Sequence, residues 1–176
     1  HRMSRTKTQI LARSTRQTMS RELFTTWADY QTAIDRVLAL ATKRICIYDE
    51  DLGLLHLETP ERLTALKAPF ASAGSDCLRI ALRNVAPLQQ RHPLLLRLLA
   101  THGHKCAMQQ TADQLAHLRD SMILVDDAHA VIRFDRDQPR GKLLVDESDE
   151  VMPYRRRFEE IWAEGGTPVA ATTLGV

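Results

Sequence analysis

Long apolar runs, common enzyme motifs and a strong net charge are all missing from this sequence of 176 residues. No apolar run approaches the roughly 20 residues of a membrane-spanning helix, and no signal-peptide pattern precedes the fold, so we expect no membrane span. A phosphate-cradling glycine loop, a Gly-x-Ser-x-Gly elbow and a Cys-x-x-Cys pair are also absent, which argues against the commoner enzyme classes. Because the net charge is only +2, overall charge does not call for nucleic acid or an anionic membrane as a partner.

Cysteine is scarce as well. The three cysteines, Cys46, Cys77 and Cys106, each lie in a short apolar run. Their odd number and their surroundings predict free, buried thiols in a reducing compartment, and we therefore expect a cytoplasmic protein.

The chain shows no internal repeat, linker or low-complexity stretch. We therefore predict one domain over residues 17–176, preceded by a basic segment over residues 1–16. Residues 9–12 of that segment are compatible with an edge strand, and so is the small, β-prone tail over residues 169–174.

Residues 120–135 form the most informative stretch. Two apolar runs, 122–125 and 130–132, flank a polar group that begins with Asp126. Short runs rich in valine and isoleucine, split by aspartates, predict two strands joined by a tight turn. The first run is apolar at every position, which is typical of a central strand buried on both faces.

Helix and strand patterns alternate before this hairpin. Apolar residues at three- and four-residue steps predict a helix over residues 22–41 that is capped by Ser20, and Thr59-Pro60 predicts the start of another. The other expected elements are strands over 44–48, 77–82, 104–108 and 142–145, helices over 94–99 and 153–164, and a turn over 139–141. The alternation predicts an α/β fold with a mixed, mostly parallel sheet flanked by helices on both faces.

This order of elements resembles one half of a phospholipase D-like domain. The segments that carry the resemblance are 44–49, 78–83, 92–103, 104–109, a strand ending in Val125-Asp126, and a closing helix with Phe158 and Trp162. The resemblance covers residues 17–162 and is to an uncharacterised bacterial branch with one domain per chain. Active members carry His-x-Lys-x-x-x-x-Asp, in which the histidine attacks phosphorus and the lysine holds phosphate oxygens. A second copy, from the same chain or a dimer partner, supplies an acid histidine.

The sequence departs from that motif in both possible registers. If Asp126 takes the aspartate position, Arg119 stands in the histidine position and Ser121 in the lysine position. Arginine stays protonated and therefore cannot act as the nucleophile. If His117 takes the histidine position instead, the aspartate position falls on Leu124, and His117 lies one pleat early, about 6.6 Å along the strand.

We therefore expect a non-catalytic domain without a cofactor that binds a phosphate-bearing ligand or a protein partner. Arg119 and Ser121 would contact the ligand and Asp126 would support them; the competing interpretation of Arg119 is a salt bridge to Asp120 or another acid. One alternative function is a divergent phosphodiesterase or nuclease that uses His117 across a homodimer. A purely structural interaction module is a third.

Three further patterns have both a functional and an ordinary interpretation. His102, His104 and Cys106 alternate as metal ligands on a strand would, but their number and spacing do not suit zinc, so no metal site is predicted. The arginines at 155–157 would suit phosphates, or the solvated face of a helix. The acids at 49–51 follow a strand, where α/β sites often lie, and suit a hard cation or a solvated loop.

Overall fold

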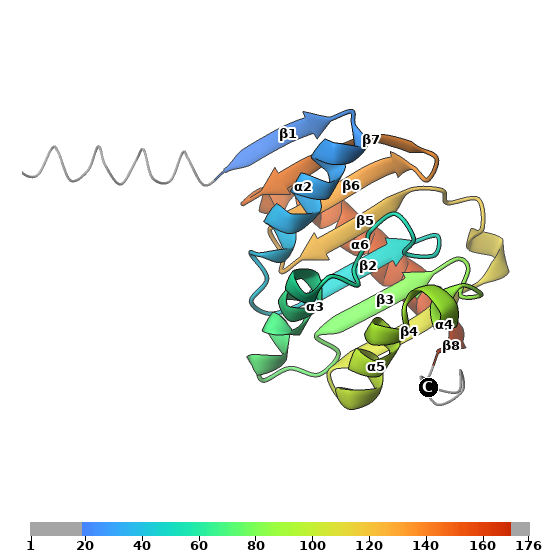
Figure 1. Ribbon diagram of the computed structural model, residues 1–176. Helices are drawn as coiled ribbons and strands as arrows, with labels where there is room; N and C mark the ends of the chain where they lie inside the picture. Colours follow the sequence, from blue (N-terminus) through green and yellow to red (C-terminus); the bar gives the residue numbers. More distant parts are fainter. Residues whose placement is uncertain (1–18, 170–176) are drawn as a thin grey trace, which may run out of the picture.

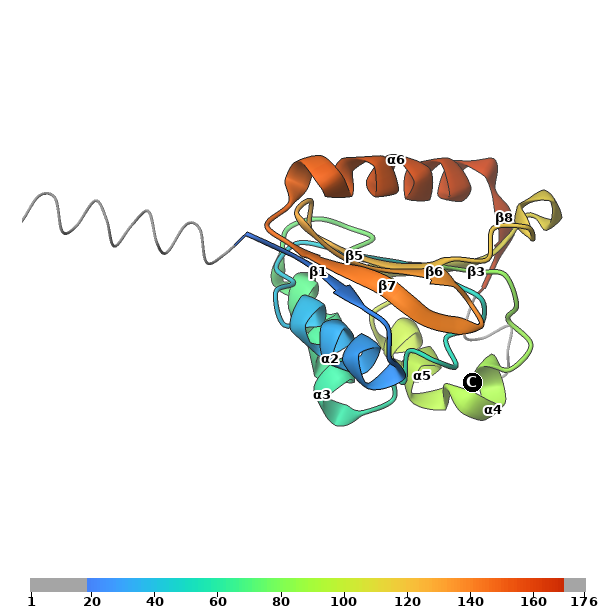
Figure 2. The ribbon, with the colours of Figure 1, turned by 90° about the horizontal axis from the view of Figure 1, so that it is seen from above.

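The computed structural model describes residues 19–169, in which eight strands form one sheet with helices on both faces (Figures 1 and 2). The strands are β1 (Ser20–Phe24), β2 (Ile45–Asp49), β3 (Leu78–Leu82), β4 (Cys106–Thr111), β5 (Ser121–Val125), β6 (His129–Asp135), β7 (Gln138–Val145) and β8 (Gly166–Pro168). Their order across the sheet is β1-β7-β6-β5-β2-β3-β4-β8.

The prediction of a mostly parallel sheet was wrong. Only the β2–β3 and β3–β4 pairs are parallel, and the other five neighbouring pairs are antiparallel. Helical crossovers join the parallel strands, whereas short turns join β5, β6 and β7, and a short connection permits only antiparallel pairing. The α/β class and the mixed sheet are confirmed.

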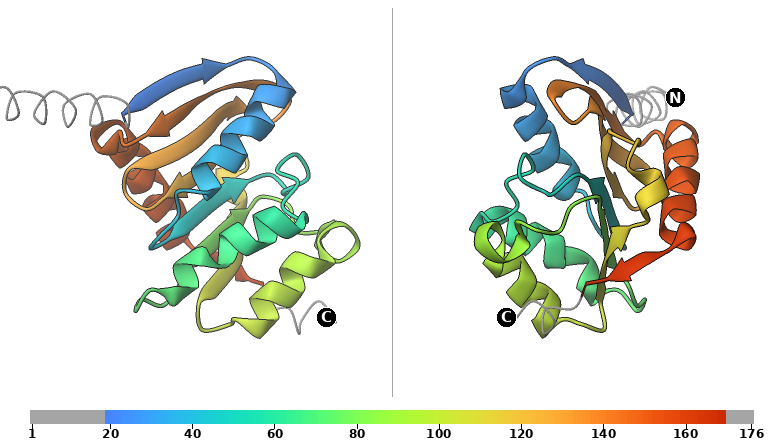
Figure 3. Two further views of the ribbon diagram at one scale, coloured as in Figure 1. Left: turned by 60° about the vertical axis from the view of Figure 1, so that its left-hand side comes forward. Right: turned by 90° about the vertical axis from the view of Figure 1, so that its right-hand side faces the viewer.

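The helices cover the two faces unequally (Figures 2 and 3). One face packs against α2 (Trp27–Leu38), α3 (Pro60–Lys67), α4 (Leu88–Arg91) and α5 (Pro93–Thr101), and the other against the long α6 (Ser148–Glu164). Two short 3-10 turns, η1 (Ala68–Ala71) and η2 (Asp113–Leu115), lie in the connections. Because β2, β3 and β5 contribute side chains to both cores, the centre of the sheet is buried on both faces.

The central hairpin over residues 120–135 is confirmed as β5 and β6. Thr59 caps α3 as predicted, since its hydroxyl oxygen accepts from the N–H of Arg62 at 3.2 Å. The three cysteines are free and buried, also as predicted. Among residues 19–169 no helix is long and apolar enough to cross a bilayer. The basic segment 1–16, the edge strand over 9–12 and the tail beyond residue 169 lie outside the described residues.

The predicted start of the first helix was wrong. Ser20 begins strand β1, and α2 starts at Trp27 with Thr26 as its cap. Pairing with β7 outweighs the local helical pattern, and Leu23, assigned to the buried stripe, is 74% exposed.

The turn predicted over residues 139–141 lies inside β7 instead. Gly141 is paired with Arg133 at a point where the backbone of β6 and the ring of Phe24 come close. An added Cβ on Gly141 would lie 2.0 Å from the carbonyl oxygen of Ile132, so glycine is needed here for close approach within a strand.

Candidate functional site

Three polar side chains form a buried row at the carboxyl end of β2. Ser121 on β5 lies directly opposite Arg133 on β6, and Asp49 of β2 follows the pair Tyr48–Met122, which brings it level with Ser121. Asp49, Ser121 and Arg133 are each only 1% exposed. Charged groups at such depth are uncommon unless they are paired, so contacts with neighbouring residues must compensate the buried charges of this row.

Asp49 and Arg133 neutralise each other. A terminal nitrogen of Arg133 donates to Asp49 Oδ1 at 3.2 Å, and the other donates to the carbonyl of Asp135 at 2.9 Å. The second oxygen of Asp49 accepts from the backbone N–H groups of Asp51 and Leu52 at 3.2 and 2.7 Å. The ion pair therefore also fixes the loop that follows β2.

Helix α2 covers the row with two aromatic rings. The guanidinium of Arg133 lies 5.0 Å from the ring centre of Tyr30 and 5.6 Å from that of Trp27. Burial raises the pKa of the Tyr30 hydroxyl, and the Arg133 charge beside it only partly offsets the effect. The Tyr30 phenol therefore stays protonated and neutral. The positively charged guanidinium of Arg133 packs against the two aromatic rings in a cation–π arrangement.

Two polar atoms of the row lack partners. Arg133 Nε and Ser121 Oγ make no hydrogen bond of good geometry with any residue between 19 and 169, although the Tyr30 hydroxyl lies close enough to both side chains for hydrogen bonding to lower its pKa. Buried donors without a partner are rare, because each costs the free energy of its lost hydration. Because both atoms are shielded from solvent, they add to the free-energy cost of the row, which the Asp49–Arg133 pair must offset.

A cavity of about 400 Å³ opens beside the row. Arg133 lies in its wall together with Arg91 of α4 and Arg136 of the β6–β7 turn. Four carboxylates and two apolar positions complete the lining: Asp49, Glu50, Asp51, Asp137, Gly53 and Leu54.

Three of the four carboxylates of this cavity form ion pairs, whereas Asp51 accepts, among the described residues, only from the backbone N–H of Gly53 at 2.9 Å. Glu50 pairs with Arg83 at 2.6 Å and with Arg136 at 3.1 Å. Burial tends to raise the pKa of Glu50, but these arginines outweigh it and the pKa is lowered. Asp137 accepts from Arg119 at 2.5 Å. In contrast, Arg91 forms no ion pair within the described part of the chain, so one cation of the cavity is uncommitted.

Arg119 is not part of the lining of this cavity, but it binds Asp137, which is, and it is held by two aspartates. Its guanidinium donates to Asp135 at 3.1 Å and to Asp137 at 2.5 Å, and its side chain remains 43% exposed. The competing interpretation from the sequence, a salt bridge, is therefore present. Strand β5 begins at Ser121, so it does not extend back to Arg119.

Asp126 lies at the opposite end of β5 from Ser121. Its carboxylate accepts from the N–H groups of Thr42, Lys43 and Arg44 and from the hydroxyl of Thr42, at 2.7–3.3 Å. It therefore holds the turn after β5 to the loop before β2. The structure brings Ser121 close to the Arg119 end of the sheet and leaves Asp126 apart from both.

His117 lines a separate hollow of about 440 Å³ together with Arg119 and Arg157. A ring nitrogen of His117 is 3.0 Å from the carbonyl oxygen of Gln114. Arg157 pairs in a bidentate manner with Asp120, at 2.5 and 2.6 Å. His117 therefore does not share the buried row with Ser121.

Sequence reasoning missed Arg91, Arg133 and the part that Asp49 plays. One local signal was available for Arg133: it alternates with Val131 on the buried face of a predicted strand, where a charge demands a partner. The partner, Asp49, was noted only as one of a group of loop acids.

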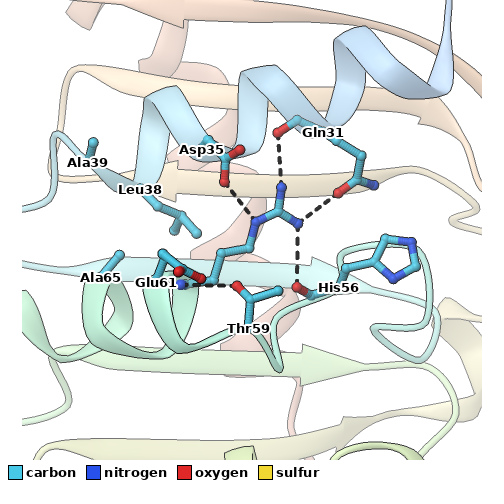
Figure 4. Close-up of a pocket in the computed structure, with 9 residues that line it drawn as sticks. Gln31, Asp35, Leu38, Ala39, His56, Thr59, Glu61 and Ala65 are labelled. Carbon is cyan, nitrogen blue, oxygen red and sulfur yellow. Dashed lines mark hydrogen bonds and ion pairs between the residues drawn. The ribbon is translucent and has the colours of Figure 1, made fainter.

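A second arginine fills a cavity of about 590 Å³ between α2 and α3 (Figure 4). Arg62 donates to Asp35 at 2.9 Å, to the side-chain and backbone oxygens of Gln31 at 2.7 and 3.0 Å, and to the carbonyl of Leu55 at 2.7 Å. Because these protein oxygens occupy its nitrogens, Arg62 ties the two helices and the loop together and offers little to a ligand.

The remaining patterns take ordinary structural roles. Arg155 pairs with Asp127, and Arg156 is exposed on α6. Cys106 is buried in the core, and within residues 19–169 no group of three or more histidine, cysteine, aspartate or glutamate side chains is placed to hold a metal ion.

Three solved structures share this fold at low sequence identity. TrmBL2, an archaeal chromatin protein with a novel mode of DNA binding, is 13% identical with a TM-score of 0.62; the match covers 94% of this chain and 66% of TrmBL2. Nuc from Salmonella typhimurium, a phospholipase D family member, is 12% identical with a TM-score of 0.58, over 86% of this chain and 99% of Nuc. NucT from Helicobacter pylori is 10% identical with a TM-score of 0.51, over 85% of this chain and 99% of NucT.

These matches confirm the predicted resemblance at the level of the fold, whereas the bacterial branch stays a prediction. No curated protein matches the chain. One family model does match it: the domain of unknown function DUF7931 aligns with residues 26–170, which is most of the sequence. The chain therefore belongs to the DUF7931 family, and it carries a phospholipase D-like fold.

Proposed function

We propose that this protein is a non-catalytic phospholipase D-like domain that binds a phosphate-bearing ligand in the cavity beside Arg133. The observation that carries the proposal is the burial of Ser121, which stands in the lysine position of the family's motif. Ser121 is 1% exposed and lies in the buried row with Arg133, so it cannot meet a substrate phosphate as the lysine does. Arg119, in the histidine position, is a permanent cation and cannot attack phosphorus.

Three arginines support an anionic ligand. Arg91 forms no ion pair within the described residues, the side chain of Arg136 is 40% exposed, and Arg133 lies deeper, 1% exposed and paired with Asp49. A guanidinium offers a planar fork of donors that matches phosphate oxygens, and the carboxyl end of a parallel strand is where α/β folds commonly bind ligands. Arg119, which pairs with Asp137 of the lining, would join by exchanging Asp137 for the ligand, since exposed ion pairs are weak.

Thermal melts with and without millimolar inorganic phosphate, or a short oligonucleotide, test this proposal. The oligonucleotide is included because TrmBL2, one of the structural neighbours, binds DNA. A ligand present at about 100 times its dissociation constant should stabilise the fold by roughly 2.7 kcal/mol.

We expect Arg91→Ala and Arg136→Ala to reduce this shift and Arg119→Ala to reduce it in part. The matched control is Arg97→Ala, because Arg97 is an exposed arginine of α5 outside the cavity. An identical shift in all four variants, or no shift in the wild type, would remove the cavity as a binding site and favour the interaction module.

One observation favours a second candidate, the divergent phosphodiesterase. His117, Arg119 and Arg157 line one open hollow, so a histidine and two cations are close together at the surface. We nevertheless expect no hydrolysis of bis-p-nitrophenyl phosphate above background. Turnover that His117→Ala abolishes and Arg91→Ala preserves would replace our proposal with this one.

A further inference from the structure

A larger cavity, of about 690 Å³, lies at the opposite end of the sheet, where β2 and β3 begin. The segment 72–77 between η1 and β3 forms one side of it. Lys43 and Arg44, just before β2, form the second side, and Trp162 of α6 closes the third. None of these residues lies in the cavity beside Arg133, so an inference here does not rest on the proposed function.

Lys105 fixes the orientation of two peptide units in the segment 72–77. The ammonium of Lys105 donates to the carbonyl of Ser72 at 2.8 Å and to that of Gly74 at 2.7 Å. A peptide unit is planar and trans, so the N–H of the following residue points away from its carbonyl. The N–H groups of Ala73 and Ser75 therefore point away from Lys105.

These two N–H groups belong to exposed residues of the segment. Neither Ala73 nor Ser75 donates a backbone hydrogen bond to any residue from 19 to 169. Both residues line the cavity, so their N–H groups are available to a ligand or to water there. Free backbone N–H groups that lie close together in a loop can bind an anion.

The other walls supply a charge and an apolar surface. Lys43 forms no ion pair within the described residues, whereas Arg44 is held by Asp127 at 2.7 Å. The Trp162 ring stacks on Phe158 with ring centres 5.9 Å apart. The guanidinium of Arg79 lies 5.4 Å from the Trp162 ring centre and is neutralised by Glu159. Lys43 is thus the free cation, and Trp162 is the aromatic wall.

We propose that this cavity binds a small phosphate-bearing molecule with a flat ring, of the nucleoside monophosphate class. The phosphate lies between the N–H groups of Ala73 and Ser75 and the ammonium of Lys43. The ring lies against Trp162. A volume of about 690 Å³ is within the range of about 300–1,000 Å³ that small-molecule sites occupy.

The two tryptophans of the chain make a direct test possible. In a Trp27→Phe protein, fluorescence comes from Trp162 alone, and we expect AMP to change it in a saturable manner. Adenosine and inorganic phosphate, as separate arms, should bind at least about tenfold more weakly, because each keeps only one of the two contacts.

Two variants test whether AMP binds in this cavity. Lys43→Ala should weaken AMP about tenfold through loss of a charge-assisted hydrogen bond. Gly74→Leu should abolish binding without unfolding the chain, because a Cβ added to Gly74 meets no atom within 4 Å and its side chain extends into open space. Thermal shifts by AMP in the Arg91→Ala chain, compared with and without Lys43→Ala, provide a second measurement of binding in this cavity.

The matched control is Arg91→Ala, which belongs to the other cavity and should leave the Trp162 signal unchanged. No response of Trp162 to AMP would overturn the proposal. So would a response that Gly74→Leu retains, or one that Arg91→Ala removes, since both would place AMP elsewhere.

Discussion

The pair formed by Asp49 and Arg133 offers the sharpest test of how this fold is held together. In Asp49→Asn, the amide oxygen can still accept from the N–H of Leu52, which leaves the amide NH₂ facing the guanidinium. A cation that is 1% exposed then has a donor where its counter-ion was, and water cannot reach it. Uncompensated charges of this kind typically cost about 3–5 kcal/mol.

Urea unfolding of the purified protein at neutral pH measures this cost. The matched control is Glu22→Gln, which breaks the exposed pair between Glu22 and Arg36, a contact of 2.7 Å whose partners are 53% and 46% exposed. That variant should lose less than about 1 kcal/mol. A similar loss in Asp49→Asn and Glu22→Gln would refute the conclusion that the pair is shielded from water.

The double variant Asp49→Asn/Arg133→Met separates the charge from the packing. Methionine keeps much of the apolar stem of arginine and removes the stranded cation. We therefore expect the double variant to be more stable than Asp49→Asn alone. If the double variant is the less stable of the two, packing by Arg133 under Tyr30 and Trp27 matters more than its charge.

Three other perturbations follow from the described contacts. Phe158→Ala should cost about 3–5 kcal/mol in urea unfolding because Phe158 is 1% exposed, and the half-buried Trp162→Ala should cost less; equal losses would contradict this packing of α6. Gly141→Ala should lose about 1–3 kcal/mol by forcing β6 and β7 apart, whereas Gly74→Ala should leave the melting temperature unchanged. Burial would raise the pKa of Asp126, but hydrogen bonds from residues 42–44 outweigh it and lower the pKa. The stability that Asp126 adds over Asp126→Asn should therefore be complete at neutral pH, begin to fall near the ordinary aspartate pKa of about 4 and decrease further as the pH drops through the lowered pKa; a difference between the two proteins that does not change from neutral to acid pH would contradict the cause.

Local patterns predicted the elements that local interactions decide. The hairpin over 120–135 and the Thr59 cap depend on neighbours a few residues away, so their residue types were sufficient. Strand β1 depends on pairing with β7, more than a hundred residues later, and the sequence around Leu23 resembles a helix until that partner is known. The parallel character of the sheet was overestimated because helix–strand alternation ends at β4. The hairpins that follow add the antiparallel pairs β5–β6 and β6–β7, and three further antiparallel pairs join strands that are far apart in the sequence.

The candidate site was harder to predict for the same reason. Asp49 and Arg133 are 84 residues apart, and neither belongs to a motif. The sequence directed attention to the end of the sheet near Arg119 and Ser121, but it could not show that Ser121 is buried. The motif spacing placed Asp126 in the same predicted site as Arg119 and Ser121. That spacing does not show that Asp126 lies at the other end of β5.

The two sets of contacts made by Asp49 and Asp126 have a consequence for motion. The neighbours β2 and β5 join the parallel half of the sheet to the antiparallel half. Asp126 binds the loop before β2 at one end of this boundary, and Asp49 binds Arg133 beside the other end. The two halves cannot separate locally unless both contacts break. The backbone amides between β2 and β5 should therefore be among the slowest to exchange with deuterated water, through opening of the whole molecule.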